Sequence, residues 1–498
     1  MTKILLPLLV LLVISLFIQS QALFGLLILG AVIYIYAINN PLKHERAYRL
    51  RSFWNWFPMG LTYAFLYMAR YNLTVSKNAL GDLMTKEDFG LIFGAGTITY
   101  AFSFLINGPL VDKIGGKRGI IISAVGAAAA NIAMGVVTYL LLNGRLAGNV
   151  SLIYAIMYSI NMYFQSYGAV SIVKVNSHWF HVKERGVFAG IFGSLIALGL
   201  FFAFDWGQAI VRATSKIAPA DLGAIEGAIR SIVMPAGAAV DYTWFVFFIP
   251  ALLLLAFAVL ELFLLKDSPS QVGFADFDTE DASSGEMDKQ FGVLQIFKKI
   301  LTNPIILTIA GIEFCSGVVR NGIMHWYFIF AKEIGEPGAT VFFKANWGKL
   351  LCIAGIYGGF LAGTLSDKLF QSRRGPSAAF MYSGMFVSVV VMAIFLWSSP
   401  LILGLSVVII SLFVIGVHGI LSGTATMDFG GRKGAATAVG LIDGFVYLGT
   451  GFQSICLGYI TTRNWSWWPI FLIPFTLIGV FLATRIWKAM PQAKRKGA

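Results

Sequence analysis

Long apolar segments separated by short polar loops run along almost the entire chain. Each segment has about 20 residues, the length that a helix needs to cross the hydrocarbon core of a bilayer. The segments are continuously apolar rather than alternating, so they do not fit the strands of a transmembrane barrel. Because backbone polar groups in a bilayer must be satisfied within each segment, the spans are helices. The pattern predicts twelve core spans, near 53–75, 89–111, 119–142, 151–175, 187–211, 243–265, 304–330, 341–365, 377–398, 400–426, 435–460 and 466–487.

An additional apolar stretch, residues 4–38, precedes these spans. It is too long for one helix, and the polar run Gln19-Ser20-Gln21 interrupts it. Its start, with Lys3 before an apolar core, also fits a signal peptide, but no small-residue cleavage site follows. We therefore expect residues 1–40 to form an uncleaved N-terminal transmembrane hairpin.

The composition agrees with a membrane protein. Hydrophobic residues make up 57% of the chain and charged residues 12%, with a mean hydropathy of +0.77. A soluble chain carries about twice that charged fraction. The formal net charge of +13 is concentrated in alternate loops, which the positive-inside rule places in the cytoplasm. We interpret this charge as a topology signal rather than a nucleic-acid site, and we expect a multi-pass protein of the inner membrane with both termini cytoplasmic.

The longest basic-side loop, residues 267–303, marks the joint between two halves of the chain. Its stretch from Asp276 to Asp288 is acidic and rich in Ser and Gly, which is typical of a solvated linker. We expect an N-terminal six-helix bundle over residues 41–266, a cytoplasmic linker over 267–303, a C-terminal six-helix bundle over 304–490 and a basic cytoplasmic tail over 491–498.

Enzymatic and metal chemistry have little support in the sequence. Cys315, Cys352 and Cys456 all fall in apolar segments and lack metal-ligand spacing. There is no nucleophile elbow and no phosphate-cradling glycine-rich loop, and the 53 glycines are spread through the helices, as membrane packing favours. We expect neither an enzyme nor a protein with a cofactor or a bound metal.

A short motif occurs once in each half. The segment Gly108-Pro109-Leu110-Val111-Asp112-Lys113 recurs as Gly363-Thr364-Leu365-Ser366-Asp367-Lys368, each at the end of the second helix of its half and each before a basic turn. A weaker pair, Lys183–Gly186 and Gly431–Gly434, opens each fifth helix. Matching copies in matching places indicate an internal repeat.

The first copy of the motif resembles the loop between helices 2 and 3 of the major facilitator superfamily, where it acts in gating and packing. This resemblance implies an all-α membrane protein with the major facilitator fold, in which two six-helix bundles related by pseudo-two-fold symmetry surround a central cavity and rock to give alternating access. The gating candidates are Gly108, Asp112, Lys113, Gly116, Lys117, Arg118, Asp367 and Lys368.

Each helix that opens a half carries one arginine inside its span. Arg70 and Arg320 occupy corresponding positions, 42 and 47 residues before the two motif aspartates. A charge at bilayer depth costs about 2.5–3.5 kcal/mol even on a lenient scale, so such residues normally face a wet cavity. Snorkelling to the interface is the alternative. Two pseudo-symmetric guanidinium groups would suit a divalent oxyanion, because arginine binds phosphate bidentately and stays protonated.

Further motifs resemble the organophosphate:phosphate antiporter family, the branch with bacterial glycerol-3-phosphate and hexose-phosphate transporters. The resemblance covers about 50–490 and implies that Arg70 and Arg320 grip the substrate phosphate. The matching segments are His178-Trp179 with the basic Lys174 before it, Lys183–Gly186, Asp267-Ser268-Pro269 with Gly273, and Gly434–Gly440 with Tyr447-Leu448-Gly449.

The chain departs from this family at three positions. Relatives often place a lysine at the position of Tyr71, and the glycerol-3-phosphate transporters place a lysine and a histidine at the positions of Phe104 and Ile196. The pair of arginines is therefore retained while its usual auxiliary donors are not. The retained arginines keep the expected preference for an anion, whereas the three departures bear on which substrate is bound.

Other polar groups in the spans are candidates to complete the site. Lys349 is either a cavity residue or an interfacial lysine. Glu313, on roughly the same face of its helix as Arg320, is either a partner for a basic group or a proton carrier. Asp443 serves either substrate selection or interhelical pairing. The candidate substrate-binding residues are Arg70, Arg320, Lys349, Asn72, Asn321, Tyr71, Glu313 and Asp443.

We expect a secondary active transporter that moves a phosphorylated organic anion, a sugar phosphate or glycerol 3-phosphate, in exchange for inorganic phosphate. We expect it to act as a monomer in the lipid bilayer. One alternative is a proton-coupled symporter of another organic anion, with Glu313 or Asp443 as the carrier. Another is a membrane sensor of phosphate esters, because the resembled family includes a hexose-phosphate sensor.

Overall fold

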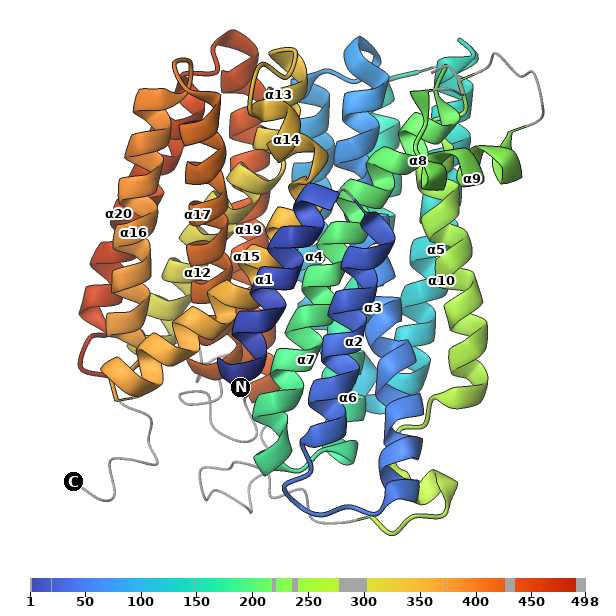
Figure 1. Cartoon of the computed structure of the whole chain (residues 1–498), viewed down its shortest axis with the longest axis vertical. Helices are drawn as coiled ribbons and strands as arrows, with labels where there is room; N and C mark the ends of the chain where they lie inside the picture. Colours follow the sequence, from blue (N-terminus) through green and yellow to red (C-terminus); the bar gives the residue numbers. More distant parts are fainter. Residues whose placement is uncertain are drawn as a thin grey trace.

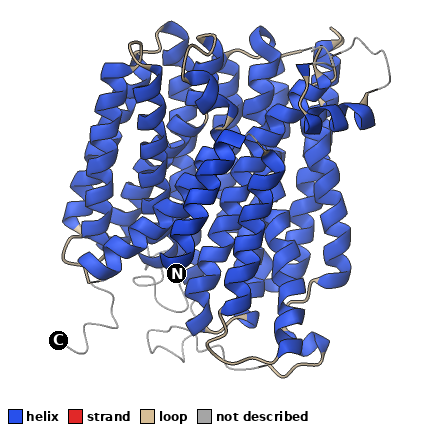
Figure 2. Ribbon diagram, in the orientation of Figure 1, coloured by secondary structure: helices blue, strands red, loops and turns tan. Residues whose placement is uncertain are grey.

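The computed structural model describes residues 2–18, 20–146, 148–216, 221–234, 241–276, 302–371, 373–425 and 435–489. In this part of the chain every regular element is a helix, and the long helices stand side by side (Figure 1; Figure 2). The prediction of an all-helical protein is confirmed. Most of the predicted linker, most of the predicted basic tail and the motif Gly431–Gly434 lie outside the described residues.

Six helical segments in the first half correspond to the first six predicted spans. Local sequence explains their ends: Thr85 and Asp88 form a capping box at the start of the second segment. Gly115, with φ 91°, makes the turn into the third, a conformation that glycine adopts without strain. The segments are α3 (Arg46–Leu80), α4 (Lys86–Ile114), α5 (Gly116–Leu142), α6 (Val150–Trp179), α7 (Val182–Phe201) continued by η2 (Phe202–Trp206) and α8 (Gly207–Thr214), and α10 (Phe245–Leu264).

Six further segments form the second half. The predicted span 304–330 breaks at His325, and the predicted span 341–365 begins only at Trp347, after the separate short helix α14 (Thr340–Ala345). The segments are α12 (Pro304–Met324) with α13 (Trp326–Glu333), α15 (Trp347–Thr364) with η5 (Leu365–Leu369), α16 (Arg374–Phe395), α17 (Pro400–His418) with η6 (Gly419–Ala425), α19 (Ala435–Arg463) and α20 (Trp467–Arg485). The remaining short elements are η1 (Gly81–Leu83), α9 (Ala224–Val233) and η4 (Pro269–Val272).

Ten helices in the described part are long and apolar enough to cross a membrane. Nine of them are predicted core spans and the tenth is the N-terminal helix Gln21–Ile38. The three core helices that miss this threshold, α3, α6 and α19, carry many of the buried polar side chains. In a membrane such side chains face the interior of the bundle, because lipid offers them no partner.

The bundle has two chemically different ends. The start of the N-terminal helix α1 (Thr2–Ile18) and the end of α20 lie at one end, the lower one in Figure 1. We call this end the basic face; it holds the turns 39–45, 265–273 and 370–371. The opposite end, the far face, holds the turns 81–85, 143–146 and 464–466 and the segment 334–346, which includes α14.

The N-terminal hairpin consists of α1 (Thr2–Ile18) and α2 (Gln21–Ile38), with Ser20 capping α2. Arg49 of α3 holds the end of α2 by donating to the carbonyls of Ala37 and Asn39, at 2.9 and 3.2 Å. Helix α2 packs on α7, whereas α1 lies against α15 of the second half (Figure 1). The hairpin therefore contacts both halves on one side of the bundle.

The two halves meet along two seams, α4 against α19 and α7 against α15. Glycines bring the backbones into contact in both. A Cβ atom on Gly90 would lie 2.9 Å from the Cα of Gly458, and one on Gly348 would lie 2.9 Å from the carbonyl oxygen of Leu200. Since these positions leave no room for a side chain, the halves are tightly apposed toward the far face.

Candidate functional site

Arg70 is fully buried in the middle of the bundle. Its guanidinium donates three hydrogen bonds: Nε to Gln165 Oε1 at 2.8 Å, one terminal nitrogen to the Tyr447 hydroxyl at 2.7 Å, and the other to the Tyr100 hydroxyl at 3.1 Å. Every one of these acceptors is neutral. The positive charge of Arg70 therefore has no carboxylate partner in the described part of the chain.

Aromatic rings surround the same guanidinium. Its central carbon lies 4.5 Å from the ring centroid of Tyr100, 4.9 Å from Tyr67, and 5.7 and 5.9 Å from Tyr447 and Tyr71. Ring faces carry partial negative charge and stabilise a cation without neutralising it. Tyr447 belongs to the second half, so its hydrogen bond to Arg70 joins the two halves at this depth.

A polar network fixes the backbone of α3 around Arg70. The hydroxyl of Tyr158 donates to the Arg70 carbonyl at 3.1 Å. The amides of Asn131 and Asn161 both donate to the Ala69 carbonyl, each at 3.1 Å. Gln165, the partner of Arg70, donates to Asn161 at 3.0 Å. Because both α5 and α6 contribute, the position of Arg70 is set by three helices.

Arg320 is in the opposite situation. It makes no hydrogen bond or ion pair with any described residue, and its Nε is buried without a partner. It interacts electrostatically with Tyr67, Tyr71 and Tyr447, three of the tyrosines around Arg70. The two arginines thus lie about the same tyrosines. Each of the three guanidinium nitrogens of Arg70 donates a hydrogen bond to a neutral acceptor, whereas Arg320 donates none to a described residue.

The predicted asparagines are placed elsewhere. Asn72 donates to Asn131 at 2.7 Å and to the carbonyl of Val246 at 3.2 Å, which ties α3 to α5 and α10. Asn321 donates to the hydroxyl of Thr450 at 2.7 Å and so ties α12 to α19. Both side chains are buried in interhelical hydrogen bonds, and in the described part of the chain neither is hydrogen-bonded to an arginine side chain.

Lys349 lies in the seam between α7 and α15. Its ammonium donates to Asn346 at 3.0 Å, and Lys349 is only 2% exposed. The carboxylate of Asp205, from the first half, accepts hydrogen bonds from the backbone amides of Gly348 at 2.8 Å and Lys349 at 3.2 Å. Asp205 therefore caps the N-terminus of a helix in the other half, where both the helix dipole and the lysine favour an anion. The structure does not bring Lys349 to the arginines.

Glu313 and Asp443 lie in one cluster toward the basic face. Oε2 of Glu313 is 2.9 Å from Nδ1 of His418. Ser422 donates to one carboxylate oxygen of Asp443. Asp443 also interacts electrostatically with His418, Glu313 and Arg320. Of the candidate residues, these two acids and the arginines are the charged groups that the structure groups together.

The two copies of the loop motif make different ion pairs. Asp112 is 3.0 Å from Lys174 of α6, whereas Asp367 is 3.0 Å from Arg374 of its own turn. In the first copy Lys117 also donates its backbone amide to Asp267 at 2.8 Å. Each copy thus connects the elements of its own half at the basic face. The remaining gating candidates, Gly108, Lys113, Gly116, Arg118 and Lys368, lie in the same two turns and helix ends.

Three residues of the arginine site were not predicted: Gln165, Tyr100 and Tyr447. Tyr447 appears in the sequence only as part of the matched segment of α19. The three lie 95, 30 and 377 residues from Arg70 along the chain. The available signal for Gln165 was the run of polar residues within a predicted span, where Asn161, Gln165 and Ser166 follow one another in α6.

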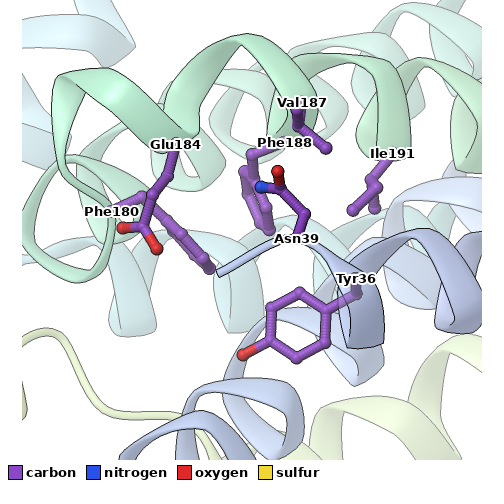
Figure 3. Close-up of a pocket in the computed structure, with 7 residues that line it drawn as sticks. All are labelled: Tyr36, Asn39, Phe180, Glu184, Val187, Phe188 and Ile191. Atoms are coloured by element: carbon purple, nitrogen blue, oxygen red, sulfur yellow. The ribbon is translucent and has the colours of Figure 1, made fainter. Parts of the chain in front are cut away.

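A separate groove lies at the basic face between the end of α2 and the start of α7. Figure 3 shows its lining, in which the rings of Phe180 and Phe188 stack at 3.7 Å. No predicted site residue lines it. The lining residues are Tyr36, Asn39, Phe180, Glu184, Val187, Phe188 and Ile191.

Comparisons with known proteins define the class. The family model of the Major Facilitator Superfamily matches residues 59–454, so the chain belongs to this superfamily. A solved structure of a bacterial homolog to the human lysosomal transporter Spinster superposes with a TM-score of 0.65 at 14% identity, covering 90% of this chain and 98% of that one. The predicted major facilitator fold is therefore confirmed.

The curated relatives narrow the class further. The chain is 24% identical to a glycerol-3-phosphate transporter of Bacillus subtilis, over 91% of this chain and 96% of the relative. It is 25% identical to a probable hexose phosphate transport protein of Chlamydia trachomatis, over 91% and 94%. It is 23% identical to the membrane sensor protein UhpC of Salmonella typhimurium, over 89% and 93%. These relatives confirm the resemblance to the organophosphate:phosphate antiporter family, and their names denote transport and sensing rather than catalysis.

Proposed function

We propose that this protein is an antiporter that exchanges an organic phosphate ester for inorganic phosphate by alternating access. One observation carries the proposal: two guanidinium groups, one from each half, lie about the same tyrosines, and neither forms an ion pair or a hydrogen bond with a carboxylate among the described residues. A dianionic phosphate would supply the missing negative charge. Arg320 would bind the phosphate through its free N–H donors. Arg70 would contribute its positive charge, and it could also donate to the phosphate by giving up hydrogen bonds to its neutral partners.

We place the basic face in the cytoplasm and the protein, acting as a monomer, in the inner membrane. The hydrogen bond between Arg70 and Tyr447 would link substrate binding to the position of the two halves. The seams at the far face would open in the alternate state, while the two motif turns, held by Asp112 and Asp367, keep each half rigid.

The test is uptake of radiolabelled phosphate into proteoliposomes. Vesicles loaded with phosphate should take up label by exchange, whereas phosphate-free vesicles should not, and a protonophore should leave uptake unchanged. Arg70→Lys and Arg320→Lys should abolish uptake, because a lysine cannot supply the bidentate fork. Equal uptake in loaded and empty vesicles would rule out exchange.

A sensor is the second candidate, because one relative is a membrane sensor protein. A sensor would bind phosphate esters and move none across the membrane. Ester-dependent thermal stabilisation of the purified protein, combined with no flux in vesicles of either loading, would favour sensing over transport.

A further inference from the structure

Asp443 lies one helical turn from the arginine site, on the side of the basic face. It precedes Tyr447 by four residues of α19, a rise of about 6 Å along the same helix face. It interacts electrostatically with Tyr100 of the first half as well as with Arg320 of the second. Since Tyr100 and Tyr447 both bond Arg70, Asp443 faces the interface between the halves rather than lipid.

The carboxylate of Asp443 is only partly satisfied. Ser422 donates to one of its oxygens, and the other has no hydrogen-bond partner in the described part of the chain. The neighbouring acid is different: Glu313 is fully buried and already has His418 at 2.9 Å. Since His418 lies against Glu313, Asp443 is the carboxylate of this cluster that keeps an oxygen without a hydrogen-bond partner among the described residues.

Two opposite charges therefore face the same interface without bonding to each other. Arg320 has no partner and Asp443 has one neutral donor, although the two groups interact electrostatically. Both residues are half-buried, and unpaired charges away from bulk water are costly, so a direct ion pair would relieve both. Their separation leaves each free for a ligand that carries both charges.

We propose, on the basis of the phosphate site above, that the preferred esters carry a cationic amine as well as the phosphate. The phosphate binds the arginines, and the ammonium donates to Asp443, with Glu313 and His418 beside it. Amino sugar phosphates and aminoalkyl phosphates have this chemistry. An ester with a hydroxyl in place of the amine satisfies the arginines but leaves Asp443 without a counter-charge.

The experiment is competition for phosphate exchange in proteoliposomes of the wild-type protein. The matched probes are glucosamine 6-phosphate against glucose 6-phosphate, and ethanolamine phosphate against glycerol 3-phosphate. A hydrogen bond between charged groups typically changes affinity about tenfold or more, so each amine ester should compete at roughly tenfold lower concentration than its hydroxyl counterpart. Equal potency would overturn the amine proposal while leaving phosphate exchange intact.

Variants then test whether Asp443 is the determinant. In Asp443→Asn the ratio of amine to hydroxyl potency should fall toward one, and Asp443→Glu should restore part of it. Glu87→Gln, an exposed acid on the first turn of α4, is the control and should keep the wild-type ratio. If Asp443→Asn kept the wild-type ratio of amine to hydroxyl potency, Asp443 would not be the group that recognises the amine. The same conclusion would follow if the variant changed only the pH dependence of exchange and kept that ratio. If the protein shows no exchange, the same four esters can be compared by how strongly each stabilises the detergent-solubilised protein against thermal unfolding. That assay gives the ratio of amine to hydroxyl potency without transport.

Discussion

The arginine site predicts that lysine has different effects at its two arginine positions: a loss of stability at position 70 and a loss of phosphate affinity at position 320. Arg70 donates three hydrogen bonds to buried neutral acceptors, whereas Arg320 donates none to described residues. Arg70→Lys and Arg320→Lys both keep the charge and remove the planar fork. They therefore make a matched pair that separates folding from substrate binding.

The expected magnitudes follow from these contacts. A hydrogen bond to a charged group contributes about 1.5–3 kcal/mol, and lysine at position 70 cannot reach Gln165, Tyr100 and Tyr447 together. We expect Arg70→Lys to lose on the order of 3 kcal/mol of stability. Arg320→Lys breaks no protein hydrogen bond in the described structure and should stay within about 0.5 kcal/mol of wild type. Its phosphate affinity should fall roughly 10- to 150-fold through loss of the bidentate contact.

Two measurements decide the matter. Thermal unfolding of purified protein in detergent, followed by tryptophan fluorescence, reports stability. Phosphate-dependent protection against unfolding reports affinity without requiring transport. The reasoning would be refuted if Arg320→Lys unfolded as early as Arg70→Lys, or if Arg320→Lys were protected by phosphate as well as wild type.

Further substitutions test other parts of the structure. Asp205→Asn removes the charge that caps α15 across the seam, an interaction worth about 1 kcal/mol. Because the seam should then open about fivefold more often, labelling of the buried Cys352 by an impermeant thiol reagent should rise by the same factor. Loss of that labelling in Cys352→Ser identifies the site. Gly317→Ala places a Cβ 1.9 Å from a backbone carbonyl of α19 and should cost about 3 kcal/mol, whereas Gly359→Ala meets nothing within 4 Å and should be neutral in the same unfolding assay. Asn131→Leu removes donors to two neighbouring segments and should both lower stability by about 2 kcal/mol and raise the half-saturating phosphate concentration.

Hydrophobic patterning predicted the helices well because each span is defined by its own residues. The twelve predicted spans, the hairpin and the polar break near Ser20 all have counterparts in the described structure. The errors in the predicted helix bounds are local. The break at His325 and the late start of α15 at Trp347 could not be predicted, because the apolar pattern runs through both points without a change. Backbone geometry at such points depends on neighbouring helices, which a single segment does not encode.

The site was less predictable, because its contacts join distant parts of the chain. The sequence identified Arg70 and Arg320 as intramembrane charges, and their burial in the spans needs no knowledge of neighbours. It did not predict that Arg70 has neutral partners while Arg320 has none. Lys349 illustrates the same difficulty: its place in an apolar span suggested the cavity, whereas the carboxylate of Asp205, 144 residues away, lies with it in a seam between the halves.

The glycine contacts between α4 and α19 have a consequence for leakage. Gly90 and Gly458 bring the two backbones directly together. One turn or two further along, Gly94 and Gly451 are also close, and the side chains of Ile455 and Ile98 pack over them. Such a joint excludes water and small ions when shut, and most of what opening it breaks is dispersion contact and weak carbon-donor hydrogen bonding, together with the hydrogen bond from Lys86 to the carbonyl of Thr461. A membrane protein that opens alternately to two compartments must do both repeatedly without passing protons or phosphate freely. A single methyl group on either helix would hold the joint ajar, so these positions set how tightly the membrane stays sealed between cycles.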